Sequence, residues 1–354
     1  MIPLDIVKVF IPAAVTFVIG MAITPAVTHY LYRHQMWKKR GGKIGLDGKP
    51  TELFNNLHTE RETGTPRFGG VVVWGSVAIA VFFISLLSLT TSIPFFDELN
   101  FLSRGQTWIP LGVLLLGAMV GLVDDLFEIR GEPAGGLSLR KRLVIVALVA
   151  LACAWWFYAK LDVSSIAIPF FSPRELGILF IPAFIIIALA MYAGGVIDGV
   201  DGLAGGVFAA MFAAYAGIAL FQNQIDLAAF CASVVGGILA FLWFNIPPAR
   251  FYLSETGTMG LTLSLTVVAF LTDVLGGGAG IAMLPIIGIV LVATVLSVLL
   301  QMVWKKIFGR KLLLISPLHH HFEAAGWPNY KVTMRYWVVS IVAAIIGLSI
   351  ALLI

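Results

Sequence analysis

The sequence predicts an all-α membrane protein with ten transmembrane helices, on three observations. Of the 354 residues, 59% are hydrophobic and only 12% are charged, about half the charged fraction of a soluble domain. Runs of about 20 mostly apolar residues, long enough to cross a bilayer, recur along the whole chain. The Lys and Arg residues gather in alternate connections between these runs. We expect a single integral-membrane domain covering residues 1–354.

Ten apolar runs are the candidate spans, at residues 9–32, 69–93, 108–127, 143–159, 176–196, 202–222, 226–246, 257–275, 278–304 and 334–354. The ninth is long enough to be tilted, or broken near Pro285. Between the fourth and fifth runs, residues 162–175 are predicted to form a short hairpin around Pro169 and Pro173. One basic residue precedes the first run and many follow it. This charge pattern predicts a spanning helix rather than a cleavable signal peptide.

The basic residues predict the orientation of the chain. With ten spans and both termini outside, the cytoplasmic loops hold all of the 23 Lys and Arg residues except Lys8, Arg104, Lys160 and Arg174. The opposite orientation would reverse that ratio, contrary to the excess of positive charge expected inside. The largest loop, 33–68, is basic, and we interpret it as a topological anchor that also touches anionic lipid headgroups.

Several classes of site are disfavoured by composition. The two cysteines, Cys153 and Cys231, both lie in apolar runs, which argues against a disulfide framework or a metal site of spaced thiols. No Walker-type loop is present, which disfavours ATP hydrolysis. No internal repeat stands out, which weighs against a transporter built on inverted halves. Nucleic acid is not an expected partner.

Three acidic clusters lie where apolar runs meet the cytoplasm. Asp124 and Asp125 end the third run, Asp198 and Asp201 occupy the loop between the fifth and sixth runs, and Glu255 begins the eighth. Charges at the end of a spanning helix cost free energy unless they are paired, hydrated or bound to a metal. Each cluster also has a structural interpretation: a hydrated helix end beside basic residues 140–142, a glycine-containing turn, and a helix cap.

A fourth polar cluster is His319-His320-His321, in the last cytoplasmic loop. Three consecutive residues do not easily ligate one zinc ion in tetrahedral geometry, so we favour contact with phosphate. Carboxylate oxygens at the same predicted depth favour Mg²⁺, which is typically held by one or two carboxylates and by substrate phosphates. Together these residues predict a site where a water-soluble phosphate compound meets a lipid.

The motifs that carry these residues resemble a known family. GTPRFGG at 64–70, VDD, DGVDGLA, FLWFNIPPA and SPLHHHFEAAGW resemble the polyprenyl-phosphate N-acetylhexosamine-1-phosphate transferases over nearly the whole chain. The last motif is similar to their phospho-N-acetylmuramoyl-pentapeptide-transferase branch. The resemblance implies ten spans in the bacterial inner membrane with the active site facing the cytoplasm.

The resemblance also implies a reaction and a set of site residues. UDP-MurNAc-pentapeptide and undecaprenyl phosphate would give lipid I, a peptidoglycan precursor, and UMP, with Mg²⁺ or alternatively Mn²⁺; a homodimer and contacts with membrane lipids are further expectations. The implied catalytic residues are Asp124, Asp125, Asp198, His320 and His321, with Asp124 the candidate to deprotonate or orient the lipid phosphate. The implied substrate-binding residues are Thr65, Arg61, Asp201, Asn245, Tyr252, Arg142 and His319. Glu255 joins Asp124, Asp125 and Asp198 as an implied metal ligand.

The chain departs from the family pattern at several of these positions. Glu255 replaces the usual aspartate, Gly195 replaces an asparagine, and Glu128 stands where a lysine is common. No lysine follows His58 before Gly64, so Arg61 is the nearest cation there, and the motif usually read TPTMGG is TPRFGG here.

These departures leave other functions open. One is a sister transferase for another UDP-sugar, such as UDP-GlcNAc, and another is a paralogue that binds lipid phosphate without turnover. The alternative from a different class is a cation- or proton-coupled transporter, which would place its acids in mid-span.

Overall fold

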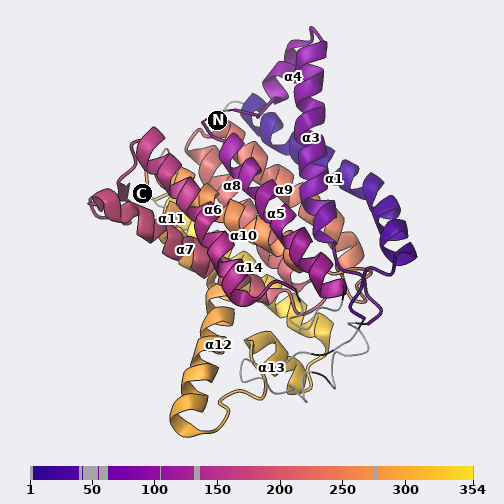
Figure 1. Ribbon diagram of the computed structural model, residues 1–354. Coiled ribbons are helices and arrows are strands. Elements are labelled where there is room, and N and C mark those ends of the chain that lie inside the picture. The colour runs from indigo at the N-terminus through magenta and orange to yellow at the C-terminus, as the bar shows by residue number, and fades with distance from the viewer. Residues whose placement is uncertain are drawn as a thin grey trace.

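The computed structural model is a bundle of long helices (Figure 1), and it describes residues 3–39, 42, 55, 63–103, 105–130, 136–274, 277–278 and 280–353. The first part contains α1 (Pro3–Arg33), α3 (Gly70–Thr90), α4 (Pro94–Leu99), α5 (Trp108–Ile129), α6 (Leu139–Lys160), β1 (Ser165–Ile166) and β2 (Arg174–Glu175). There follow η1 (Gly177–Leu179), α7 (Phe180–Gly194), η2 (Gly195–Ile197), α8 (Leu203–Phe221), α9 (Ile225–Asn245), α10 (Ser254–Val274), α11 (Gly280–Ile287), α12 (Ile289–Phe308), α13 (Leu318–Ala324) and α14 (Asn329–Ala351).

Nine helical stretches in the described ranges are long and apolar enough to cross a membrane. They are α1, α3, α5, α6, α7 with its flanking 3₁₀ turns, α8, α9, α12 and α14. The prediction of an all-α, multi-pass membrane protein is therefore confirmed. The predicted run 257–275 corresponds to α10, which is not among the nine, so a tenth span stays a prediction.

Helix α10 is polar in sequence and buried in the bundle. Its threonines donate their hydroxyl hydrogens to carbonyl oxygens one turn earlier: Thr258 to Ser254 at 3.1 Å, Thr262 to Thr258 at 2.8 Å, and Thr266 to Thr262 at 2.9 Å. These bonds satisfy groups that would find no water inside a bilayer. The helix packs against α5, α7, α11 and α3, so its polar face contacts protein.

The long run 278–304 is broken, which is one of the two predicted alternatives. Helix α11 ends at Ile287 and α12 begins at Ile289, with Gly288 between them, three residues after Pro285. Beyond this break, α12 projects away from the other helices, with α13 beside it (Figure 1). The predicted hairpin is also present, because β1 pairs antiparallel with β2 and Ser165 lies opposite Glu175.

Two glycines on α5 let it approach α10 closely. A Cβ atom on Gly117 would lie 2.9 Å from the Cα of Gly260, and one on Gly121 would overlap the backbone carbonyl of Glu255. Contacts between small residues allow helix backbones to approach each other in membranes. The consequence here is that the acidic C-terminal end of α5 meets the N-terminal end of α10.

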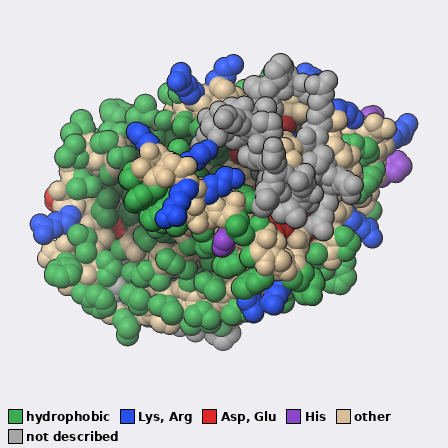
Figure 2. Space-filling view, turned by 90° about the horizontal axis from the view of Figure 1, so that it is seen from below, with side chains coloured by type: hydrophobic (Ala, Val, Ile, Leu, Met, Phe, Trp, Pro, Cys, Tyr) green, Lys and Arg blue, Asp and Glu red, His purple; other side chains and the backbone are tan. Residues whose placement is uncertain are grey.

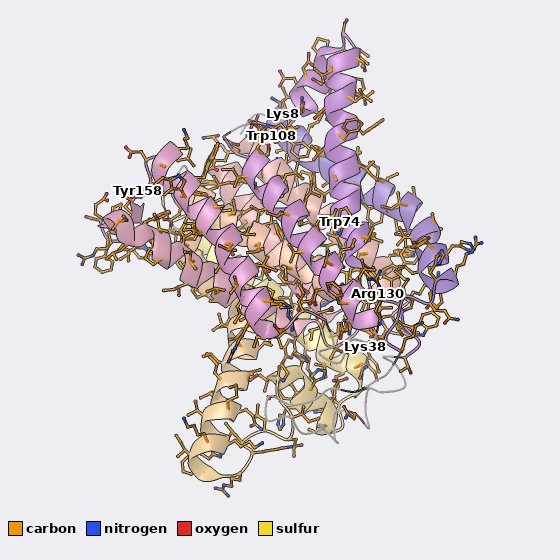
Figure 3. The ribbon with its side chains drawn as sticks, in the orientation of Figure 1. Lys8, Lys38, Trp74, Trp108, Arg130 and Tyr158 are labelled. Carbon is orange, nitrogen blue, oxygen red and sulfur yellow. The ribbon has the colours of Figure 1, made fainter. Side chains whose placement is uncertain are left out.

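The labelled side chains show which residues lie at each of the two ends of the bundle. Lys8, Trp108 and Tyr158 lie toward one end, while Lys38 and Arg130 lie toward the other (Figure 3). Both chain termini lie toward the first end (Figure 1), and α12 projects from the second. Lys and Arg side chains stand out on the face at this second end (Figure 2).

Candidate functional site

The candidate site lies where the end of α5 meets the start of α10, and Asp125 is its most buried carboxylate. Its side chain is 0% exposed. Its Oδ2 accepts hydrogen bonds from the backbone N–H of Thr256 at 2.9 Å and from the Thr256 hydroxyl at 2.6 Å. Its Oδ1 has no hydrogen-bond partner among the described residues and lies 3.6 Å from Nη1 of Arg67. One oxygen is therefore fixed by α10 and the other faces a cation.

The neighbouring Asp124 is arranged in the same way. Its Oδ1 accepts the backbone N–H of Leu137 at 2.6 Å, which ties the end of α5 to the segment before α6. Its Oδ2 lies 3.7 Å from Nη1 of Arg142, in the first turn of α6. Again one carboxylate oxygen is held by a neutral donor, and the second is directed at a guanidinium.

Glu255, in the first turn of α10, shares that guanidinium. Its Oε1 accepts a hydrogen bond from Arg142 Nη1 at 2.6 Å, and each side chain is 24% exposed. Its Oε2 lies 3.5 Å from the hydroxyl of Thr258. Arg142 thus stands between Asp124 and Glu255, which belong to different helices, and a charge-assisted hydrogen bond of this length is among the stronger kinds.

A third group of contacts brings the loop after η2 to the same place. Asp198 Oδ2 accepts the N–H of Ser254 at 2.7 Å, and the Ser254 hydroxyl oxygen accepts the N–H of Phe68 at 3.1 Å. Ser254 and Phe68 both have positive φ, 52° and 71°, which is uncommon for non-glycine residues and is often found at functional sites. Asp198 therefore fixes the residue that begins α10.

The segment that contains Thr65 is joined to the residues before α10 through the backbone. Tyr252 donates its N–H to Pro66 at 2.9 Å, and its carbonyl accepts the N–H of Gly69 at 2.8 Å. Thr65 and Tyr252 are each half-buried beside this pairing. These two segments, distant in sequence, therefore pair through their backbones next to the start of α10.

Asn245 and Asp201 support the loops around the site. Asn245 is 3% exposed, and it accepts the Gly202 N–H at 2.9 Å while donating to the Phe251 carbonyl at 2.7 Å. Asp201 Oδ2 accepts the Ala249 N–H at 3.2 Å. These contacts join the loop after η2 to the segment that precedes α10.

The histidines on α13 pack against the Asp198 loop. A Cβ atom on Gly199 would lie 2.7 Å from Nε2 of His320 and 2.8 Å from Nε2 of His319, so only glycine allows this approach. Nδ1 of His320 lies 2.6 Å from Oε2 of Glu323. Because a carboxylate only accepts, this contact places the hydrogen on Nδ1 and fixes the ring. His319 and His320 are both buried.

His321 points elsewhere. Its Nδ1 accepts the N–H of Leu314 at 3.2 Å, and its ring lies 5.8 Å from that of Phe322. The three consecutive histidines therefore do not converge on one point.

Comparison with known proteins assigns the family. Residues 107–273 match the model of glycosyl transferase family 4. Over 87% of this chain and 89% of its own length, the phospho-N-acetylmuramoyl-pentapeptide-transferase of Caldanaerobacter subterraneus is 32% identical. The protein of the same name from Dichelobacter nodosus is 31% identical, with 97% and 92% covered, and that from Chloroflexus aggregans is 30% identical, with 99% and 91% covered. The chain belongs to the phospho-N-acetylmuramoyl-pentapeptide-transferase family.

In this member of the family, most of the sequence-predicted residues gather at one end of the bundle. Asp124, Asp125 and Glu255 lie at the junction of α5 and α10, where Arg142 contacts Asp124 and Glu255 while Asp125 bonds Thr256 and faces Arg67. The Asp198 loop contacts the start of α10 on one side and His319 and His320 on the other. His321 turns toward Leu314 instead. Arg61 lies outside the described residues, and the ligand contacts assigned to Thr65, Asp201, Asn245 and Tyr252 stay predictions.

Sequence reasoning missed four of the residues that shape the site. Thr256, the residue after Glu255, donates twice to Asp125. Glu323 follows His320 by three residues on α13, so helical spacing offered a signal that was not used. Arg67 and Glu128 were noted as departures from the family motifs but were not placed together, and they form an ion pair of 2.6 Å.

The donor set fits a hard divalent cation, although the described side chains do not form a preassembled metal site. In that part of the chain, no group of three or more His, Cys, Asp or Glu side chains is arranged to hold an ion. However, Asp124 and Glu255 each direct an oxygen at Arg142, and the buried Oδ1 of Asp125 receives no described hydrogen bond. Buried polar atoms without partners need an explanation such as a bound ion, and carboxylate oxygens suit Mg²⁺.

Proposed function

We propose that this protein transfers phospho-MurNAc-pentapeptide from UDP-MurNAc-pentapeptide to undecaprenyl phosphate, giving lipid I and UMP. The observation that carries the proposal is that Asp124, Asp125 and Glu255 meet two guanidinium groups, those of Arg142 and Arg67, at one helix junction. The chain also matches transferases of that name over almost its whole length. An oxygen of the lipid phosphate forms a bond to the sugar-proximal phosphorus of the donor. The bond from that phosphorus to the UMP oxygen breaks, and UMP leaves with the electron pair.

The site residues supply charge and position for this transfer. Arg142 offers a guanidinium to phosphate oxygens, and its contacts with Asp124 and Glu255 fix its place. Asp124 is the carboxylate proposed to deprotonate or orient the lipid phosphate, because it lies at the helix end beside that cation. His320, held by Glu323, presents its second ring nitrogen toward the Asp198 loop. We assign it contact with a donor phosphate.

Mg²⁺ is the proposed cofactor, with Mn²⁺ as the alternative ion. Asp124, Asp125, Glu255 and Asp198 are the residues that would hold it. Asp198 contributes by fixing Ser254 at the start of α10. A divalent ion in this place would neutralise charge on the pyrophosphate during transfer.

The proposed orientation puts the site in the cytoplasm of a bacterial cell, with the protein in its inner membrane. The site end of the bundle carries Lys38 and Arg130, and Lys305 and Lys306 lie in the last turn of α12. An excess of Lys and Arg is expected on the cytoplasmic side. Ten spans, with α10 as one of them, would then leave both termini outside.

The test is donor selection by the purified protein. Undecaprenyl phosphate is supplied with UDP-MurNAc-pentapeptide, UDP-MurNAc or UDP-GlcNAc, and UMP release is measured. We expect release with the pentapeptide donor, loss of release with a chelator, and its return with Mg²⁺ or Mn²⁺. Asp124→Asn is the matched inactive variant. Equal or greater release with UDP-GlcNAc would assign the protein to the sister transferases, and full activity in excess chelator would remove the ion from the mechanism.

A further inference from the structure

Two departures from the family motifs lie in direct contact. Arg67 stands in the TPRFGG segment before α3, and Glu128 stands in the last turn of α5. Their side chains form an ion pair, with 2.6 Å between Arg67 Nη1 and Glu128 Oε2, and they are only 16% and 14% exposed. Because these two unusual residues come from separate segments and contact each other, we interpret them as a pair of compensating changes.

The pair lies beside the most buried acid of the site. Arg67 Nη1 is also 3.6 Å from Asp125 Oδ1, the oxygen that receives no hydrogen bond from any described residue. The other oxygen of Glu128, Oε1, is 2.8 Å from Nζ of Lys38. Glu128 therefore holds a cation on each of its two oxygens, and one of these cations faces Asp125.

The backbone fixes Arg67 in this place. Its N–H donates to the Met36 carbonyl at 2.8 Å, and the next residue, Phe68, donates its N–H to the Ser254 hydroxyl oxygen at 3.1 Å. Phe68 adopts a φ of 71°. The guanidinium is thus held through its backbone as well as its ion pairs, which is the preorganisation expected of a group that positions a substrate.

We propose that Arg67 is a phosphate-positioning residue of this protein, held in place by Glu128 and Lys38. The family motifs commonly place a lysine at position 128 and a threonine at position 67, so their positive charge lies on α5. Here the charge stands on the segment before α3 and approaches the same carboxylate from the other side. The inference rests on the proposed function, because it takes the phosphate groups of the donor and of the lipid as the ligands.

A purely structural ion pair is the competing explanation, and it makes a different forecast. Loss of a pair with only a structural role would change the melting temperature at most, and it would not change the apparent affinity for phosphate substrates. A positioning cation changes kcat/KM for the substrate whose phosphate it contacts, with little change in melting temperature. Measuring kcat/KM therefore distinguishes a positioning role from a purely structural one.

The experiment is a double-mutant cycle of Arg67→Thr and Glu128→Lys. Each single variant should lose on the order of tenfold or more in kcat/KM. The first removes the cation beside Asp125, and the second places an ammonium against Arg67 and Lys38. The double variant restores one cation and should recover to within about threefold of the parent. Separate titrations of the UDP donor and of undecaprenyl phosphate show whose phosphate Arg67 contacts.

Three further measurements keep the result interpretable. Arg67→Lys keeps the charge and should retain more activity than Arg67→Thr. Glu98→Lys, which disrupts the ion pair with Lys8 toward the opposite end of the bundle, is the control and should behave as the parent. Melting temperatures in detergent, with and without UDP-MurNAc-pentapeptide or undecaprenyl phosphate, report substrate binding without turnover.

The outcomes distinguish this inference from the proposed function. If the parent releases no UMP, the proposed function fails, and the ligand-induced rise in melting temperature still shows whether Arg67 is needed for binding. Losses that multiply in the double variant would overturn the pairing of the two residues. Parental kcat/KM in a folded Arg67→Thr variant would overturn the positioning role.

Discussion

Replacing Glu255 by glutamine separates the two roles that the structure allows for it. Glu255 either holds Arg142 in place or also binds the proposed Mg²⁺. The ion pair of 2.6 Å between them, with each side chain 24% exposed, sets the size of the first effect. A hydrogen bond between charged groups contributes about 1.5–3 kcal/mol. The lower end applies here, because Asp124 still lies 3.7 Å from the same guanidinium nitrogen.

The catalytic effect is expected to be larger than the effect on stability. If Glu255 is a ligand, Glu255→Gln removes a charged donor from an ion that provides several kcal/mol of transition-state stabilisation. Turnover should then fall by on the order of 10²-fold or more, which corresponds to about 2.7 kcal/mol. Glu255→Asp keeps the charge, but its side chain is shorter by one carbon–carbon bond, about 1.5 Å. We expect it to be impaired as well, with a raised Mg²⁺ requirement.

The assay is UMP release as a function of Mg²⁺ concentration for the parent and both variants, together with melting temperatures in detergent. Glu98→Gln is the matched control, because it removes a carboxylate that pairs with Lys8 away from the site. Near-parental release by Glu255→Gln, with the parental Mg²⁺ dependence, would refute the ligand assignment. The ion would then be held by Asp124 and Asp125 without it.

Three other predictions test the site and its orientation. Gly121→Ala should lower stability by about 1–3 kcal/mol, because its Cβ would overlap the backbone at the start of α10; an unchanged melting temperature would contradict the close approach of the two helices. Asp198→Asn should keep the fold, since an amide oxygen can still accept the N–H at the start of α10, but lose on the order of 10²-fold in UMP release. Retained activity would make Asp198 part of a structural turn only. Single cysteines near Ser138 and Asn329 should resist impermeant thiol reagents in intact cells, whereas one near Ser164 should react, and labelling near Ser138 without lysis would refute the orientation.

Much of the fold could be predicted because the signals are local in sequence. Apolar runs mark the long helices, Pro285 marks the place near which the ninth run breaks, and Pro169 with Pro173 marks the hairpin. Helix α10 was expected as the span 257–275, although its threonines reduce its hydropathy; their hydroxyls are satisfied within the helix. Hydropathy alone does not reveal that satisfaction, which depends on helical geometry.

The contacts of the site were less predictable because they join distant segments. The acidic clusters were expected at one membrane depth, and the structure places Asp124 and Glu255 beside Arg142, Asp125 beside Thr256, and Asp198 beside Ser254. Which donor serves which oxygen depends on the register between α5 and α10. Gly121 sets that register, because any larger residue there would overlap the backbone of Glu255. The sequence shows the glycine within an apolar run but not the residue that it packs against. Pairings of this kind need the assembled bundle.

The departures from the family motifs are explained by the residues that they contact, and not by each change taken alone. Glu128, taken alone, replaces a lysine and adds negative charge beside Asp125, and Arg67, taken alone, adds a positive charge. In the structure the two charges meet at 2.6 Å, and Lys38 offsets the remaining oxygen of Glu128. Glu255 likewise keeps the charge of the usual aspartate and reaches Arg142 across the helix junction. Because Arg67 offsets the added charge of Glu128 and keeps a guanidinium beside Asp125, we expect an active transferase rather than a paralogue that only binds lipid phosphate.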